Sequence, residues 1–170
     1  MVDVEYIKQK LRLEPLPMEG GHFRETYRSR TQLKSECLPG MYGSERSLST
    51  GIYYLLTPET FSALHRLPGD EIFHFYLGDP VEMLQLHPGG RTSRFMLGTD
   101  LEAGMHPQVC VPGGTWQGAR LLNGGRVALL GTTMAPGFEF SDFIAGNRAE
   151  LIEHYPDAAE LIIALTHDEQ

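Results

Sequence analysis

Short hydrophobic runs recur along most of the chain, and glycine and proline turns separate them. Within several runs, hydrophobic and polar residues alternate with a period of two, which is typical of a half-buried strand. The pattern predicts strands at His22–Ser29, Ser49–Leu56, Phe61–His65, Glu71–Leu77, Val81–Leu86, Thr92–Leu97, Gln108–Val111, Thr115–Leu122 and Arg126–Met134. Many short strands joined by regular turns indicate an all-β chain folded as an antiparallel sandwich or barrel.

Two turns are expected to form hairpins. Asn123, Gly124 and Gly125 have the composition of a tight hairpin turn. A second tight turn contains Pro68 and separates the strands 61–65 and 71–77. If these two strands pair, residues at their facing ends approach each other.

Helical patterns are found only at the two ends of the chain. Asp3 can cap a short N-terminal helix, and a helical tail begins at Asn147 and breaks at Pro156. The second piece of the tail has an apolar face formed by Leu161, Ile162 and Leu165. No alternation of strands with helices supports a parallel α/β sheet.

Length and charge narrow the function classes. A chain of 170 residues is most simply one domain, 1–170, large enough to bury a core. The net charge of −8 argues against nucleic acid or an anionic membrane surface as the main partner. A local basic group can still meet an anionic small molecule, and the candidates are Arg24, Arg28, Arg30 and Lys34.

The cysteines and the N-terminus predict a cytoplasmic location. Cys37 and Cys110 are far apart and form neither a disulfide framework nor a metal knuckle. The first ten residues contain acids and no apolar core, so we expect no secretory signal. The apolar runs are too short to span a bilayer.

The richest group of ionisable side chains lies between His65 and His74. Strand alternation places Glu71 on one face with Phe73 and Phe75, and His74 on the other face. A carboxylate buried beside two phenylalanines needs a partner, because an unpaired buried charge is costly. Glu71 therefore belongs either to a pocket or to an ion pair at the barrel rim, for which Arg66 and Arg94 are the candidates, and His74 is expected to be structural or interfacial.

Three further groups of residues each have two interpretations. Gln117 suits ligand recognition, because its amide both donates and accepts, and it equally suits a core bonded to backbone. Arg24 and Tyr27 can bind a carboxylate or lie on a solvated strand face. Phe138 and Phe140 are expected to join the core rather than a ligand-stacking platform.

Together these residues resemble the cupin superfamily. The first cupin motif, H-x-H, three residues, E, six residues, G, matches His65, Glu71 and Gly78, with Leu67 in place of the second histidine. The second motif, P-x-G-x-x-H, matches residues 112–117, with Gln117 in place of the histidine. Glu59 occupies the position of the glycine that usually opens the first motif.

A closer resemblance, to a largely uncharacterised fifth cupin family, covers nearly the whole chain through four separated motifs in order. They are EGGHFRETYRS (19–29), SALHRLPGDEIFHFYLGDP (62–80), PQVCVPGGTWQGA (107–119) and PGFEFSDF (136–143). His22 and Ile72 depart from the residues expected at their positions. The resemblance implies a double-stranded β-helix, the cupin jelly-roll barrel, with short terminal helices, a pocket inside the barrel and a homodimer.

The resemblance also implies site residues. His65 and Glu71 are the catalytic candidates, and Arg24, Trp116, Gln117 and Phe75 are the ligand-binding candidates. Cupin metal sites use three histidines and a glutamate, of which only His65 and Glu71 are present. We therefore predict no cofactor, and a divalent metal at His65, Glu71 and Gln117 remains the alternative.

Three functions stay open from the sequence. The first is binding or sensing of a small polar or anionic molecule, such as a nucleotide sugar, without chemistry. The second, by analogy with the dTDP-sugar epimerase group of cupins, is metal-independent epimerisation or isomerisation, with His65 as base, Glu71 orienting it and Arg24 holding an anionic group. The third is metal-dependent chemistry at a degenerate site.

Overall fold

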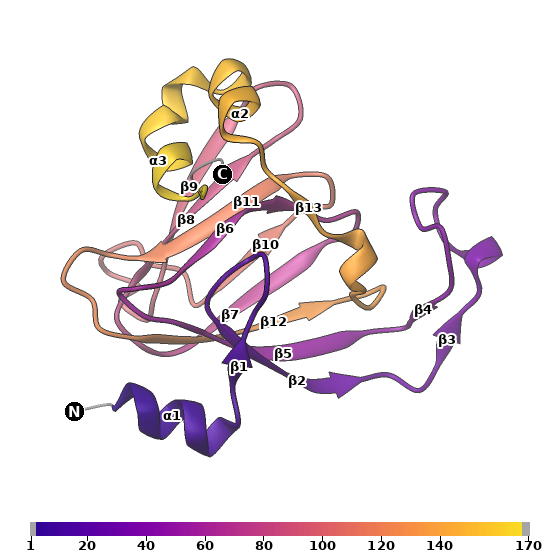
Figure 1. The fold of residues 1–170 in the computed structure, drawn as a ribbon, viewed down its shortest axis with the longest axis horizontal. Helices are drawn as coiled ribbons and strands as arrows, with labels where there is room; N and C mark the ends of the chain where they lie inside the picture. The colour runs from indigo at the N-terminus through magenta and orange to yellow at the C-terminus, as the bar shows by residue number, and fades with distance from the viewer. Residues whose placement is uncertain (1–2, 168–170) are drawn as a thin grey trace.

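The computed structural model describes residues 3–167 and contains two large antiparallel β-sheets that face each other (Figure 1). The six-stranded sheet has the order β1 (Glu14–Pro15), β2 (His22–Arg28), β5 (Thr50–Leu56), β12 (Ala128–Met134), β7 (Glu71–Gly78) and β10 (Gln108–Val111). The five-stranded sheet has the order β13 (Ile144–Ala145), β6 (Phe61–Arg66), β11 (Trp116–Leu121), β8 (Val81–Leu86) and β9 (Thr92–Leu97).

Most strands that follow one another in the chain belong to opposite sheets. β5 and β7 lie in the six-stranded sheet, whereas β6 between them lies in the five-stranded sheet, and β10, β11 and β12 alternate in the same way. This alternation makes the molecule a jelly roll, in which the inner faces of both sheets close around one core. The predicted strands and the all-β fold class are confirmed.

The hairpin predicted at 123–125 is wrong, and the pairing considered for 61–65 and 71–77 does not form. β6 and β7 do not pair, because the turn at Pro68 and Gly69 carries the chain from one sheet to the other. The turn at 123–125 likewise joins β11 to β12 across the two sheets. Local turn composition specifies a reversal of direction but not the partner strand, and burial of both apolar faces decides that partner.

The core of the barrel follows the strand alternation. Glu71, Phe73 and Phe75 of β7 point inward, while Ile72 and His74 lie on the outer face, as expected. Fully buried large side chains fill the space between the sheets, among them Tyr54, Phe73, Met83, Leu97 and Leu130. Burial of each such side chain stabilises the fold by roughly 1.5–3 kcal/mol.

Helices cover parts of the outer faces. α1 (Val4–Leu11) is capped by Asp3 as predicted, and its Ile7 packs on the six-stranded sheet. α2 (Arg148–His154) and α3 (Ala159–Ala164), joined by a 3-10 turn at Pro156–Ala158, cover the five-stranded sheet. The predicted apolar face of the tail is confirmed, because Leu161, Ile162 and Leu165 are buried there.

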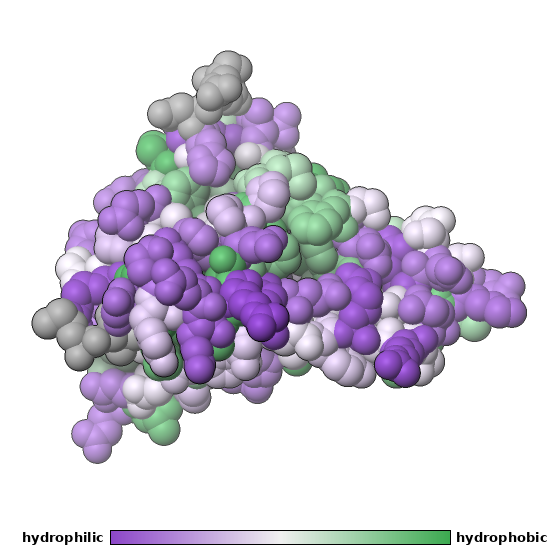
Figure 2. Space-filling view, turned by 60° about the horizontal axis from the view of Figure 1, so that its bottom comes forward, coloured by the Kyte–Doolittle hydropathy of each residue, from purple (hydrophilic) through white to green (hydrophobic). Residues whose placement is uncertain are grey.

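An arm projects from one side of the barrel (Figure 1). It consists of β3 (Gln32–Leu33), a 3-10 turn at Ser35–Cys37 and β4 (Arg46–Ser47), and β3 and β4 pair with each other. Figure 2 shows that hydrophilic residues dominate the face drawn there and that apolar residues gather in a patch above the centre of the view. None of the helices within residues 3–167 has the length and apolarity needed to cross a membrane.

Candidate functional site

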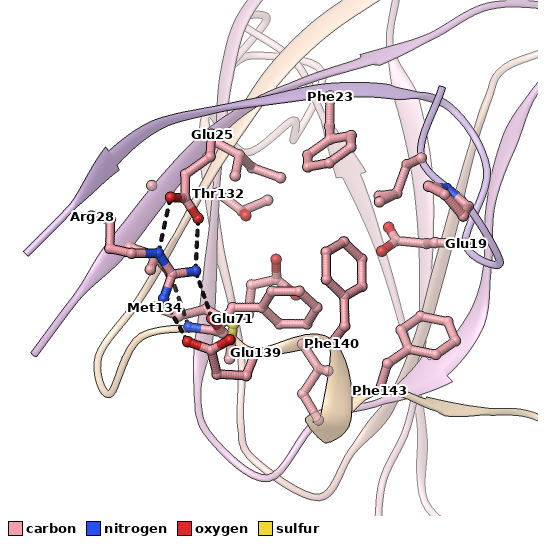
Figure 3. Close-up of a pocket in the computed structure, with 17 residues that line it drawn as sticks. Glu19, Phe23, Glu25, Arg28, Glu71, Thr132, Met134, Glu139, Phe140 and Phe143 are labelled. Atoms are coloured by element: carbon pink, nitrogen blue, oxygen red, sulfur yellow. Dashed lines mark hydrogen bonds and ion pairs between the residues drawn. The ribbon is translucent and has the colours of Figure 1, made fainter. Parts of the chain in front are cut away.

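A cavity of about 70 Å³ lies between the inner face of the six-stranded sheet and the segment 136–143 (Figure 3). One water needs roughly 10–15 Å³ on this measure, so the cavity has room for several waters or a small organic group. Its wall carries four phenylalanines, four glutamates and one arginine: Phe23, Phe138, Phe140, Phe143, Glu19, Glu25, Glu71, Glu139 and Arg28.

A β-bulge decides which side chains of β2 reach the cavity. Strict alternation would place Arg28 on the face opposite Phe23 and Glu25. The pairing of β2 with β5 slips between Glu25 and Tyr27, so that the parity changes after the bulge. Arg28 therefore lines the cavity together with Phe23 and Glu25.

A cluster of buried polar groups lies at the deep end of the cavity, where Glu71 and Glu19 line the space and His65 and Gln117 lie behind them. Glu71, at the start of β7, accepts a hydrogen bond of 2.7 Å from Nε2 of Gln117 on β11. His65 lies beside Gln117 on the neighbouring strand, because their Cα positions pair in the register of β6 and β11. Glu19 completes the cluster, with its Oε2 3.9 Å from Nε2 of His65. We call His65, Glu71, Gln117 and Glu19 the deep cluster.

Burial and a like charge change the acidity of Glu71. Removal from water raises the pKa of Glu71, and the neighbouring Glu19 carboxylate raises it further. His65 and the hydrogen bonds from Thr132 and Gln117 act in the opposite direction, and the pKa stays above its usual value. Glu71 therefore holds a proton at higher pH than an exposed glutamate does.

The hydrogen bonding of His65 fixes its tautomer. Nδ1 lies 2.8 Å from the carbonyl oxygen of Ala63, and a carbonyl can only accept, so Nδ1 carries the hydrogen. Nε2 is the ring nitrogen that faces Glu19. The ring is 1% exposed and stacks on Phe143, with 5.0 Å between ring centroids. Phe143 also lines the cavity, so it separates His65 from the open part of the space.

The mouth of the cavity has a different chemistry. Arg28 donates to both carboxylate oxygens of Glu25, at 2.9 and 2.8 Å, and to Glu139 at 2.6 Å. It also donates to the carbonyl oxygen of Phe138. Figure 3 shows this group on one side of the cavity and Glu19 on the other side. One guanidinium therefore serves two carboxylates, and the mouth carries a net negative charge.

The segment 136–143 is fastened at a second point. Asp142 accepts both hydrogen bonds of a bidentate pair from Arg46 on β4, and both side chains are almost fully buried. The backbone N–H of Gly137 donates to the carbonyl oxygen of Ser47, 2.7 Å away. The arm and the barrel edge thus hold the segment that carries Phe138, Phe140 and Phe143 against the cavity.

The turns of the two sequence motifs support the deep cluster. Asp70 accepts a 2.8 Å hydrogen bond from the backbone N–H of Gly113. A Cβ atom at Gly113 would overlap the carbonyl oxygen of Pro68, so this position needs glycine. Asp70 thus ties the two motif turns together.

The structure places the sequence-derived residues in three environments. His65, Glu71 and Gln117 come together in the deep cluster, and Phe75 lies in the core of the barrel next to the cavity wall. Arg24 points away from the cavity, where its guanidinium donates to the carbonyl of Leu11 at 2.9 Å.

Trp116 and His74 are also outside the cavity. Trp116 packs with the helices on the outer face of the five-stranded sheet, and the guanidinium of Arg66 lies 4.7 Å from its ring centroid. His74 lies on the outer face of the six-stranded sheet, within 3.0 Å of the Thr133 hydroxyl. The ion pair of Glu71 with Arg66 or Arg94 does not form, because Glu71 turns inward to Gln117.

Sequence reasoning missed Glu19, Phe143, Glu139 and the role of Arg28 at the cavity. Glu19 and Phe143 lie in the two motifs that carry no obvious catalytic residue, 19–29 and 136–143. The signal that could have found them is that a charged or an aromatic residue stands inside a family motif to which no function had been assigned. The expectation that Phe138 and Phe140 join the core is wrong, since both line the cavity.

The donor set does not fit a tightly held metal ion. Within residues 3–167, no group of three or more histidine, cysteine, aspartate and glutamate side chains is placed to hold an ion. Leu67 has no donor atom, and Gln117 turns its amide nitrogen toward Glu71. An amide N–H cannot ligate a cation, and the remaining carbonyl oxygen of Gln117 is a weaker ligand than the imidazole of the missing motif histidine.

Comparisons with known proteins agree with this fold. The family model described as "Cupin superfamily (DUF985)" matches residues 5–145. The uncharacterized protein YML079W of Saccharomyces cerevisiae is 33% identical over 136 residues, which cover 73% of this chain. The match spans 66% of the yeast protein, slightly less than two thirds of its length.

Solved structures extend the likeness to the whole chain. Protein SO0799 from Shewanella oneidensis is 32% identical and superposes with a TM-score of 0.87, covering 99% of this chain and 100% of that chain. A hypothetical protein from Leishmania major is 30% identical, also with a TM-score of 0.87, over 98% and 100% of the two chains.

Oxalate decarboxylase from Bacillus subtilis shares only 14% identity. Its TM-score of 0.53 covers 92% of this chain and 38% of that chain. This more distant likeness concerns the fold alone.

Proposed function

The chain belongs to the family described as "Cupin superfamily (DUF985)", and we propose that it binds a small polar molecule in the barrel cavity. The observation that carries this proposal is the deep cluster, where Glu71 and Glu19 line the cavity and, within residues 3–167, the buried Oε1 of the adjoining Gln117 has no hydrogen-bond partner. Buried polar atoms are rarely left unpaired, so an unpartnered one behind a polar cavity wall indicates a ligand or water.

The charge of the cavity argues against an anionic ligand. Four carboxylates face the cavity, and the single guanidinium, Arg28, already binds Glu25 and Glu139. The phosphates of a nucleotide sugar would meet those carboxylates at the mouth. A sugar-sized polar molecule without phosphates suits the cavity better.

Recovery of a ligand from cell extract tests the binding proposal. We expect the wild-type protein to retain a small molecule that mass spectrometry detects after extract exposure and washing. Leu67→Trp fills the cavity and should abolish retention, whereas Leu101→Trp adds the same side chain at an exposed position and should not. Equal retention by both variants would remove the cavity as the binding site. Circular dichroism checks that each variant is folded.

A second candidate is proton transfer without a metal, as in the sugar epimerase or isomerase expectation. His65 favours it, because its Nε2 lies 3.9 Å from Oε2 of Glu19, which is too long for a direct hydrogen bond, so a hydroxyl placed beside both atoms could bridge them. Glu71, with its raised pKa, can supply or accept the matching proton. Arg24 points outward and does not serve this reaction.

Deuterium exchange tests proton transfer. The recovered molecule is incubated with the protein in heavy water, and incorporation at carbon is followed by NMR. His65→Ala should slow incorporation by about 100-fold or more, whereas His154→Ala, at an exposed site, should not. Incorporation that survives in His65→Ala would leave binding without chemistry as the function.

Pairing of two copies is also proposed. The outer face of the six-stranded sheet carries Tyr27 and Tyr76, which are 56% and 48% exposed. Tyr76 packs edge-on against Tyr53, with 6.1 Å between ring centroids, so the face is ordered and aromatic, as subunit interfaces are. Light scattering should give a dimer mass for the wild type, and Tyr76→Arg should shift it toward the monomer. A monomeric wild type would remove this proposal.

A further inference from the structure

The deep cluster presents hydrogen-bond acceptors to the cavity. The donors around it are already directed elsewhere, because Ser62 donates to Glu19 at 2.8 Å and Nδ1 of His65 faces Ala63. Nε2 of Gln117 donates to Glu71. What remains toward the cavity is the carboxylates of Glu71 and Glu19.

The carbonyl oxygen of Gln117 adds an independent observation. Oε1 is buried, and the side chain is 1% exposed, yet within residues 3–167 this atom has no hydrogen-bond partner. It belongs to the same amide that holds Glu71, so it lies within the deep cluster. A buried carbonyl oxygen left unpaired is a position where a donor from a ligand would be favourable.

The aromatic wall lies above these acceptors. Phe140 packs edge-on against Phe138, at 5.2 Å between ring centroids, and against Phe23, at 6.5 Å. Figure 3 shows Phe23, Phe140 and Phe143 around the space above Glu71. Faces of phenylalanine rings carry partial negative charge and attract cations, more strongly when water is excluded.

We propose that the group entering this cavity is a nitrogen cation rich in N–H donors, an amidinium, a guanidinium or an alkylammonium. Its N–H groups bind Glu71 and Glu19, and its apolar part packs on the phenylalanine rings. The inference rests on the proposed binding function and specifies the ligand class. A neutral sugar also brings donors, but it leaves the excess of carboxylates in the cavity uncompensated.

Isosteric probes separate charge from shape. Benzamidinium, benzamide and benzoate have nearly the same outline with charges of +1, 0 and −1, and acetamidinium, acetamide and acetate form a smaller set for the same comparison. Titration by calorimetry or NMR should show each amidinium binding at least tenfold more tightly than its amide. Each carboxylate should bind most weakly.

Charge-matched variants locate the binding. Glu71→Gln should reduce the preference for amidinium over amide at least fivefold. Glu153→Gln removes the same charge at an exposed position of α2 and should leave the preference unchanged. Gln117→Leu removes the amide that holds Glu71 and should weaken binding of the amidinium probes without changing binding of benzoate or acetate. Circular dichroism and thermal melting confirm that each variant is folded.

The outcomes distinguish this inference from the proposed function. If the neutral amides or the molecule from cell extract bind in the cavity and the amidinium shows no preference, the cation inference is overturned and binding stands. If Glu71→Gln and Glu153→Gln change the preference equally, the effect is one of overall charge and the inference also fails. If no amidinium binds, the inference is overturned, and if the extract experiment is negative as well, so is the proposed function.

Discussion

The deep end and the mouth of the cavity use similar residue types in different ways. At the deep end, His65 and Gln117 are 1% exposed and lie on strands whose register fixes them. At the mouth, the side chains of Glu25 and Glu139 are 37% and 44% exposed and share one arginine. Polar groups are costly to bury and inexpensive to leave exposed. A polar group buried at the deep end therefore indicates a function. An exposed polar group at the mouth indicates only that the cavity opens to solvent there.

The segment 136–143 links these two environments. Phe143 stacks on His65, whereas Glu139 pairs with Arg28 and Asp142 pairs with Arg46. One short segment thus covers the deep histidine and forms the mouth. Substitutions in this segment and next to it can show separately what the deep end and the mouth contribute to stability, metal affinity and reactivity.

The largest expected effect is at the buried ion pair. Arg46→Ala leaves Asp142 buried without its partner and should lower the free energy of unfolding by about 3–5 kcal/mol. Arg28→Ala, at the partly exposed mouth pair, should cost at most about 1 kcal/mol. Urea denaturation of both variants measures the contrast. Equal losses would show that the mouth is as rigidly built as the buried pair.

Restoring the motif histidines should change metal affinity strongly. The double variant Leu67→His and Gln117→His supplies the two donors that the deep cluster lacks, next to His65 and Glu71. We expect its affinity for Mn²⁺, Ni²⁺ or Zn²⁺ to exceed that of the wild type by at least about 100-fold, since two imidazole ligands are added. Calorimetry and elemental analysis measure it. If the wild-type protein already binds one equivalent of one of these metal ions tightly, the metal-dependent function would be favoured again.

A smaller effect is expected on the reactivity of His65. Phe143→Ala removes the ring stacked on the imidazole and should expose His65 to diethyl pyrocarbonate. Peptide mass spectrometry should show modification of His65 at least several-fold faster than in the wild type. His154, which is exposed, serves as the internal control and should react equally in both proteins. An unchanged rate at His65 would mean that Phe143 does not limit access.

The smallest expected effect is a pH dependence of stability. The pKa of Glu71 is raised in the folded state by burial and by Glu19, so the folded protein binds this proton more tightly than the unfolded chain does. Stability from Glu71 is fully present below the unfolded value near 4.5 and is lost as the pH rises through the raised folded value. Glu71→Gln should therefore gain stability relative to the wild type between pH 4 and pH 7. Thermal melts across that range measure the difference, and a constant difference contradicts the raised pKa.

Residues on regular strands were predictable from the sequence. The period-two pattern of 71–77 placed Glu71 inside and His74 outside, and both positions are confirmed. The motif spacing brought His65, Glu71 and Gln117 to one cluster. Arg24 and Arg28 were not distinguishable in this way, because a bulge after Glu25 reverses the parity, and alternation counted along the sequence does not reveal a bulge.

The sequence by itself determined the elements, the parity of the regular strands and the family, because these depend on local periodicity and on motif spacing. Only the tertiary structure decided that β6 and β7 lie in opposite sheets, that Glu19 reaches His65, and that Phe143 covers it. Those contacts join segments far apart in the chain, and closure of two sheets around a shared core selects them. The tertiary structure also determined the charge of the cavity, because Glu19, Glu25, Glu71 and Glu139 come together only when the barrel closes.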